Sequence, residues 1–215
     1  MAAKKALLVV CVLAVVAPAV ADAQSWVLRA RAIAIEPDDS SSEVGDTGSY
    51  LTVDGQYTIE VDITRKFNHF LGLELIAATA EHDIDVERGA LAGASAGSVK
   101  VLPPTLTLQW FILGEGFFSP YVGAGVNFTK FYSYDLSSDL AGLGVTDVDF
   151  DDSWGFAANA GFDINLSRLI LNFDVKYIDI STDAAIRVDG GTLDTVSVDV
   201  NPWVIGAGVG FRFGS

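Results

Sequence analysis

Residues 56–64 read QYTIEVDIT, and this stretch decides the fold of the chain. Apolar residues alternate strictly with polar ones, beginning with Tyr57 and Ile59 on one side and Thr58 and Glu60 on the other. A period of two places the two sets on opposite faces of a β-strand, whereas a helix would mix them around its circumference. The stretch therefore predicts a strand with one apolar and one polar face.

The same alternation recurs along the chain. The predicted strands are residues 26–36, 56–64, 69–80, 101–113, 119–131, 153–165, 168–180 and 200–213. Most exceed the length of about 9–11 residues that a tilted strand needs to cross a bilayer. Aromatic residues begin or end many of the apolar runs, as expected of belts at two membrane interfaces. These residues are Trp26, Tyr57, Trp110, Phe128, Trp154, Tyr177, Trp203 and Phe213.

The connections between these strands alternate in length. The short ones are residues 65–68, 114–118 and 166–167, and the long ones are 37–55, 81–100, 132–152 and 181–199. Short periplasmic turns and long extracellular loops are typical of outer-membrane barrels. We therefore expect an all-β fold: an eight-stranded antiparallel transmembrane β-barrel with short periplasmic turns and four long extracellular loops. Residues 136–143 indicate a short helix within one of these loops.

A soluble, lipocalin-like barrel is the alternative, because it keeps its apolar face inside. The polar face of this chain carries charges of both signs, which can neutralise one another in a narrow lumen. This favours the membrane barrel and predicts a network of ion pairs in the lumen, on a face that also carries Asp163. The predicted network is Arg29, Arg31, Glu60, Asp62, Glu74, Asp174, Lys176 and Arg212.

The N-terminus resembles a secretory signal. Lys4 and Lys5 precede the apolar residues 6–17, and small residues follow. We expect a signal peptide at residues 1–23, cut after Ala23 or else after Ala21, because the apolar run is too short for a spanning helix. The barrel domain is then residues 24–215, exported to the outer membrane of a Gram-negative cell.

The one cysteine, Cys11, lies inside that predicted signal, so the mature chain offers no thiol for a disulfide, a metal site or catalysis. Removal of Lys4, Lys5 and Asp22 changes the formal net charge from −15 to −16. A protein this acidic repels phosphates, so nucleic acid is not an expected partner.

Three motifs have simpler explanations than a ligand site. Residues 206–210 read GAGVG but lack the helix that must follow in a dinucleotide loop, so these glycines are expected to face a crowded lumen or a close neighbouring strand. Residues 147–152 alternate carboxylates without the glycine and glutamate of a calcium loop, so no metal site is predicted.

Loop carboxylates could still hold divalent cations against lipopolysaccharide: Asp38, Asp39, Glu43, Asp46, Asp135, Asp139, Asp183 and Asp189. His69 and His82 are expected on opposite rims with no serine motif beside them, so we expect neither an enzyme nor a cofactor.

Five segments resemble the OmpW family of outer-membrane proteins. They are residues 26–31 (WVLRAR), 102–109 (LPPTLTLQ), 120–127 (PYVGAGVN), 172–180 (NFDVKYIDI) and 201–204 (NPWV). The resemblance implies an eight-stranded barrel with a narrow, hydrophobic channel that helps small hydrophobic molecules, such as alkanes, across the lipopolysaccharide barrier. It also implies that Gly208, Phe211 and Phe213 are read by the barrel-assembly machinery, although this chain continues for two residues past the final aromatic.

We therefore expect a passive outer-membrane channel for small hydrophobic molecules. Ile76, Phe111 and Ile170 point inward by parity, so they are expected to line the passage. The alternative is a non-conducting structural barrel whose acidic loops bind surface partners. The expected partners are outer-membrane lipid, lipopolysaccharide, the assembly machinery and small hydrophobic solutes.

Overall fold

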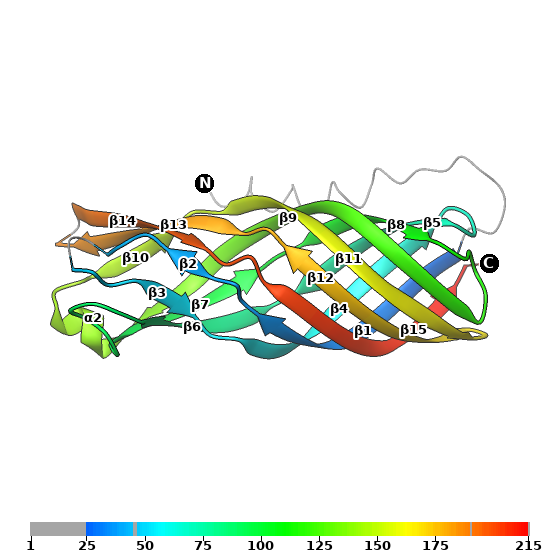
Figure 1. Ribbon diagram of the computed structural model, residues 1–215, viewed down its shortest axis with the longest axis horizontal. Helices are drawn as coiled ribbons and strands as arrows, with labels where there is room; N and C mark the ends of the chain where they lie inside the picture. Colours follow the sequence, from blue (N-terminus) through cyan, green and yellow to red (C-terminus); the bar gives the residue numbers. More distant parts are fainter. Residues whose placement is uncertain (1–24, 45–46, 190, 215) are drawn as a thin grey trace.

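The computed structural model describes residues 25–44, 47–189 and 191–214, which form a long, closed β-barrel (Figure 1). The predicted signal peptide lies outside the described residues. Eight strands make the wall: β1 Ser25–Glu36, β4 Gln56–Lys66, β5 Leu71–Ala78, β8 Thr105–Phe111, β9 Phe118–Leu136, β11 Ser153–Leu166, β12 Leu169–Ile178 and β15 Trp203–Phe213. Each pairs antiparallel with its neighbours in the order β1-β4-β5-β8-β9-β11-β12-β15, and β15 pairs with β1. The predicted eight-stranded antiparallel barrel is confirmed.

The two ends of the barrel differ. The connections β4–β5, β8–β9 and β11–β12 are short and lie at the end that also holds the C-terminus (Figure 1), which we call the turn end. The four long connections gather at the opposite end, which we call the loop end.

The four long connections are present as predicted, but they are built largely of β-strands instead of irregular chain. They contain β2 Ser40–Ser41, β3 Leu51–Val53, β6 Ala80–Val86, β7 Ser95–Leu102, β10 Asp147–Phe150, β13 Ser181–Val188 and β14 Gly191–Asp199. β7 pairs with residues 130–136 of β9, and β6 and β3 follow it, so these strands extend the barrel sheet. β10, β13, β14 and β2 form a separate sheet. The alternation of apolar and polar residues in these strands is short and is interrupted by many carboxylates. The sequence therefore does not reveal their apolar face, which is buried where the two sheets pack together.

The predicted strand at residues 101–113 is in fact two strands. β7 ends at Leu102 and β8 begins at Thr105, with Pro103 and Pro104 between them. Proline has no backbone N–H to donate to a sheet, so the ladder must be interrupted there.

Two other strands begin later than predicted. β5 begins at Leu71 rather than at residue 69, because the Asn68 side chain accepts hydrogen bonds from the backbone N–H groups of Phe70 and Leu71 and forms a turn. β15 begins at Trp203, after Asn201 with a φ of 38° and the imino residue Pro202. Neither change moves a side chain to the other face.

The predicted faces of the wall are confirmed. Exposed apolar side chains cover the outside, and they include Ile59, Val61, Leu108, Val122, Val126, Phe156, Leu171, Ile205, Val209 and Phe211. Charged residues point inward, and glycines opposite them supply the room. Gly208 pairs with Arg31, and a Cβ atom on it would lie 2.7 Å from the Arg31 Cα and 2.1 Å from the Ala30 oxygen.

Aromatic residues form a belt near each end of this apolar surface. Towards the loop end, Phe128 contacts Trp154 and Tyr177 contacts Trp203, with ring centroids 4.8 Å and 5.3 Å apart. At the turn end, Trp26 lies opposite Phe213 in the β1–β15 register, and the Arg65 guanidinium stacks 4.7 Å from the centre of the Trp26 ring. The two belts bound the surface expected to face lipid.

The predicted short helix is confirmed as α2 Ser138–Gly142, next to the end of β9. The Ser137 hydroxyl caps it by accepting a hydrogen bond from the Leu140 N–H at 3.1 Å. Within the described ranges, no helix combines the length and the apolar character needed to cross a membrane.

Candidate functional site: an apolar cavity above a buried charge cluster

Two arginines of β1 occupy the middle of the lumen. The Arg29 guanidinium lies 2.9 Å from both Asp62 Oδ1 and Asp163 Oδ2. Arg31 Nη2 lies 2.8 Å from Asp62 Oδ2, and Arg31 Nε lies 2.8 Å from Glu60 Oε1. These side chains are almost fully buried, so each charge depends on its partners instead of on water.

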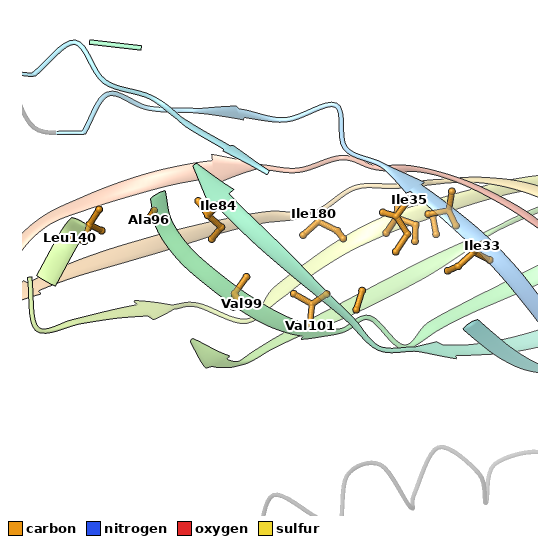
Figure 2. Packing of buried hydrophobic residues seen from close by; sticks show 12 residues of the cluster. Ile33, Ile35, Ile84, Ala96, Val99, Val101, Leu140 and Ile180 are labelled. Atoms are coloured by element: carbon orange, nitrogen blue, oxygen red, sulfur yellow. The ribbon is translucent and has the colours of Figure 1, made fainter. Parts of the chain in front are cut away.

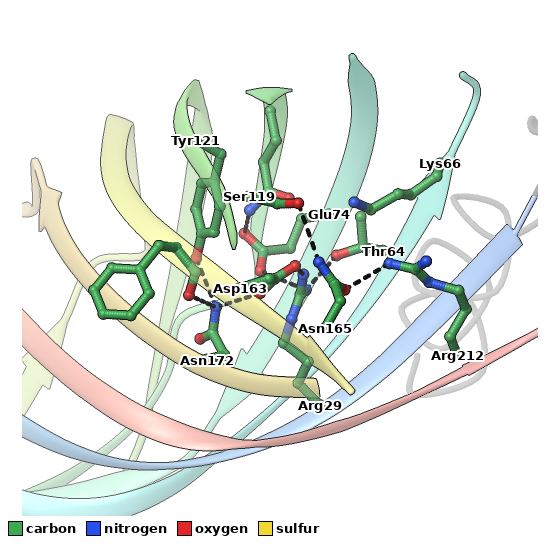
Figure 3. Close-up of polar contacts among 12 residues, drawn as sticks. Arg29, Thr64, Lys66, Glu74, Ser119, Tyr121, Asp163, Asn165, Asn172 and Arg212 are labelled. Atoms are coloured by element: carbon green, nitrogen blue, oxygen red, sulfur yellow. Dashed lines mark hydrogen bonds and ion pairs between the residues drawn. The ribbon is translucent and has the colours of Figure 1, made fainter. Parts of the chain in front are cut away.

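Glu74 joins both arginines to the far wall. Its Oε1 lies 3.0 Å from Arg31 Nη2 and 3.6 Å from Arg29 Nη1. Its Oε2 accepts hydrogen bonds from Thr107, Gln109 and Asn159 at 2.8–3.3 Å. One carboxylate therefore ties β1 to β5, β8 and β11 across the barrel. Figure 3 shows Glu74 and Arg29 among the polar side chains that point into the lumen.

Lys176 completes this layer by donating to Glu60 at 2.9 Å and to Asp174 at 2.6 Å. We call the layer the charge cluster. It consists of Arg29, Arg31, Lys176, Glu60, Asp62, Glu74, Asp163 and Asp174. Tyr121 donates to Asp174 and Asn172 donates to Asp163, so neutral side chains supply further hydrogen bonds to the carboxylates of the cluster.

The structure brings together every member of the predicted network except Arg212. Arg212 lies at the turn end, where it donates to Asn165 at 2.8 Å and faces Glu115 at 3.7 Å. Lys66 faces the same Glu115 at 3.4 Å and lies 3.4 Å from the centre of the Phe111 ring. These contacts fill the lumen below the charge cluster. Lys66 and Glu115 were missed because both fell in segments predicted as turns.

An apolar cavity, which we call the inner cavity, lies on the side of the charge cluster that faces the loop end. Its volume is about 70 Å³, and Glu60 forms part of its floor. Its walls include Ile33, Ile35, Ile76, Val101, Ile180 and Val204. Figure 2 shows buried apolar side chains following the interior from Leu140 at the loop end to Ile33.

The three predicted passage residues do not share this cavity. Ile76 lines it. Phe111 and Ile170 are fully buried, but Phe111 packs against Tyr121 and Lys66, and Ile170 lies opposite Gly210 near the turn end. The charge cluster therefore separates Ile76 from the other two.

A second hollow of about 360 Å³ opens farther towards the loop end, and we call it the outer cleft. It lies between the β3–β6–β7 extension with α2 on one side and the β10–β13–β14 sheet on the other. Leu51, Ile84 and Phe150 line both hollows, so they form the partition between them. Phe150 is held there by ring contacts with Phe131 and Tyr134 at centroid distances of 5.7 Å and 5.5 Å.

The wall has a slit beside the inner cavity. The ladder between β4 and β5 ends where Glu60 lies opposite Ala78. Beyond that pair, the Thr58 hydroxyl donates to the Thr79 carbonyl at 2.9 Å. A hollow of about 340 Å³ lies here, lined by Gln56, Tyr57, Thr58, Thr79, Ala80, Glu81 and Lys100. Ala80 lines both this slit and the inner cavity, so the two spaces are neighbours.

The comparisons with known proteins agree with this architecture. The model of the OmpW family matches residues 22–213. The chain belongs to the OmpW family. This OmpW-family chain is 35% identical over 193 residues to outer membrane protein W of Vibrio cholerae, covering 87% of this chain and 88% of that one. It is 38% identical over 191 residues to an uncharacterized outer-membrane protein of Sinorhizobium fredii, covering 87% and 80%. The crystal structure of the outer membrane protein OprG from Pseudomonas aeruginosa superposes with a TM-score of 0.83 at 36% identity, covering 90% of this chain and 97% of that one.

Family membership places this OmpW-family barrel in the outer membrane. The soluble-barrel alternative is therefore wrong, and the exposed apolar surface between the aromatic belts faces lipid. The turn end is periplasmic and the loop end is extracellular, as the lengths of the connections predicted.

Proposed function

We propose that this protein is a passive channel through which small apolar molecules enter the outer membrane. Solutes enter at the extracellular end, pass the partition at Phe150 and occupy the inner cavity. They then leave sideways through the slit between β4 and β6 into the lipid. The observation that carries the proposal is the apolar cavity next to a break in the wall.

The charge cluster supports a sideways exit. A solute moving straight on would have to separate Arg31 from Glu60 and Glu74 and then pass Phe111, Lys66 and Glu115. Separating buried ion pairs costs several kcal/mol for each charge left unpaired. Opening the slit breaks the Thr58–Thr79 hydrogen bond, at a typical net cost of about 1 kcal/mol.

Side chains must move for transport, because about 70 Å³ holds only a few water-sized molecules. The same small volume favours the second candidate, a non-conducting barrel whose extracellular extensions bind surface partners. The two functions differ in one measurable quantity, the uptake of an apolar solute across a lipopolysaccharide-bearing membrane.

The test uses a Gram-negative host without its own homologue and a radiolabelled alkane. Uptake should rise several-fold when the protein is expressed, and equal uptake with and without it would overturn the channel. A Thr58→Cys/Thr79→Cys pair, bridged by a short bis-maleimide, should then reduce uptake towards the background. The matched control is Ile63→Cys/Leu75→Cys, which bridges β4 and β5 where their ladder is already closed, so uptake should be unchanged.

A further inference from the structure

The outer cleft has an apolar lining and a wide opening. Its residues include Leu91 in the β6–β7 connection, Leu140 and Leu143 at α2, and Ile186 and Leu193 in the separate sheet. Leu143 and Leu193 are 59% and 69% exposed, so large apolar side chains stand at the mouth of the cleft in contact with water. Exposed apolar surface of this kind marks a binding site more often than chance would give.

The net charge of the protein is concentrated around this cleft. The extracellular segments, residues 36–58, 79–104, 130–152 and 179–202, carry 20 carboxylates and 4 cationic side chains among the described residues. The rest of the described barrel carries 6 carboxylates and 7 cationic side chains and is close to neutral. The negative field is thus a property of the entrance and not of the membrane-spanning wall.

Two carboxylates act on the cleft directly. Asp194 is part of its lining. Asp147 lies near enough to Tyr134, another lining residue, to act on its hydroxyl: burial, with a further contribution from this carboxylate, raises the pKa of Tyr134 to about 12. The carboxylates of Asp194 and Asp147 both disfavour the binding of a negatively charged group inside the cleft.

We propose that the outer cleft is a charge-selective capture site, which binds the apolar chain of a neutral or cationic solute and rejects anionic amphiphiles of the same chain length. This inference deepens the proposed function, on which it rests, by naming the class of solute. An alkane, an ester or an amine gains the apolar contacts without electrostatic cost. A fatty-acid carboxylate loses affinity to the surrounding acids, by about tenfold at low ionic strength.

The experiment places the mature protein, labelled with ¹⁵N, in nanodiscs of zwitterionic lipid. The probes are a nitroxide-labelled ten-carbon fatty acid, its methyl ester and the corresponding primary amine. Paramagnetic broadening is read at the amides of Leu143 and Leu193 for the outer cleft. Val122, on the lipid-facing wall, reports how much probe has dissolved in the bilayer.

At equal broadening of Val122, the ester and the amine should broaden both cleft amides, and the acid should do so about tenfold less. Raising the salt to about 1 M, where the Debye length falls to roughly 3 Å, should reduce this difference. The Asp147→Asn/Asp194→Asn variant should admit the acid more readily. The control, Asp38→Asn/Asp199→Asn, removes the same amount of charge at the base of the extracellular segments, where the Asp38 N–H donates to the Val200 carbonyl. It should change the difference between ester and acid less.

Equal broadening by ester and acid in low salt would overturn the charge selection. Broadening of Val122 without broadening of Leu143 and Leu193 would overturn the capture site itself. Neither result depends on passage through the slit, which the uptake and cross-linking measurements test separately.

Discussion

Arg31 and Glu74 lie 43 residues apart in sequence and meet at the centre of the lumen, with Arg31 Nη2 at 3.0 Å from Glu74 Oε1. Glu74 also accepts hydrogen bonds from Thr107 and Gln109 on the neighbouring strand β8 and from Asn159 on β11. This one side chain therefore links β1 to β5, β8 and β11, in addition to the other ion pairs of the charge cluster.

Replacing Glu74 by glutamine keeps the size of the side chain but removes the charge that balances the arginines. The free energy of unfolding should fall by about 3 kcal/mol or more, because a buried ion pair loses one partner. Urea titration in lipid vesicles, followed by tryptophan fluorescence, measures it. The control is Glu81→Gln, which removes a half-exposed partner of Lys100 and should cost less than about 1 kcal/mol. Equal losses would contradict the bracing role.

Phe150 should control which solutes reach the inner cavity. Phe150→Ala removes the ring that stands between the two hollows, so uptake of bulky apolar solutes should rise several-fold relative to slender ones. Phe150→Trp should have the opposite effect. The matched control is Phe156→Ala, which removes a phenyl ring from the lipid-facing wall and should leave the ratio unchanged. An unchanged ratio in both Phe150 variants would exclude this residue as the constriction.

His82 should make the extracellular end sensitive to acid. Its ring nitrogen Nδ1 lies 3.0 Å from the Asp54 carbonyl, and burial lowers the pKa of its imidazole despite this bond and the nearby Asp83 carboxylate. A histidine whose pKa is lowered on folding holds its proton better when the segment opens. Stability that is fully present above about pH 6.5 is therefore lost as the pH falls below that value towards the lowered pKa of the folded state.

Hydrogen exchange of the Asp54 amide, which bonds the Asp83 carbonyl at 3.1 Å, measures this local opening. Exchange should accelerate between pH 7 and pH 5, after correction for the intrinsic rate, and His82→Asn should remove most of the acceleration. His69→Asn, at the exposed turn end, serves as the control and should leave it in place. The same acceleration in the His82 variant would show that another group is responsible.

Gly208 should matter for packing even where the assembly machinery is absent. A Cβ atom there would collide with backbone atoms of β1, so Gly208→Ala should destabilise the barrel by about 2 kcal/mol and slow its folding into pure lipid vesicles. Phe213→Ser changes a 40% exposed ring at the edge of the apolar surface and removes the final aromatic of the expected assembly signal. This variant should fold better in vesicles than Gly208→Ala but insert poorly in cells. Normal vesicle folding of Gly208→Ala would leave recognition by the machinery as its only role. Gly142→Ala, where an added Cβ meets nothing within 4 Å, is the control.

The slit and the partition could not be predicted from the alternation. Thr58 and Glu60 share one polar face in the sequence, yet Glu60 lies in the closed part of the ladder and Thr58 lies at the slit. The strand extensions were missed for a related reason: residues such as Ala184 and Val196 become buried only when the two extracellular sheets pack together. The predicted set of lumen charges agrees better with the structure, because only Arg212 lies outside the charge cluster. Asp163, which joins the cluster, is on the face predicted to point into the lumen.

The sequence by itself determined the wall. A strict period of two fixes which side chains face lipid and which face the lumen, and the positions of the aromatic residues and glycines fix where each strand crosses the membrane. Only the tertiary structure decided which lumen charges meet, because Arg31 reaches Glu60, Asp62 and Glu74 through the register of neighbouring strands and the closure of the barrel. Parity specifies a face but not a height along the barrel, and height separates the outer cleft, the inner cavity and the charge cluster.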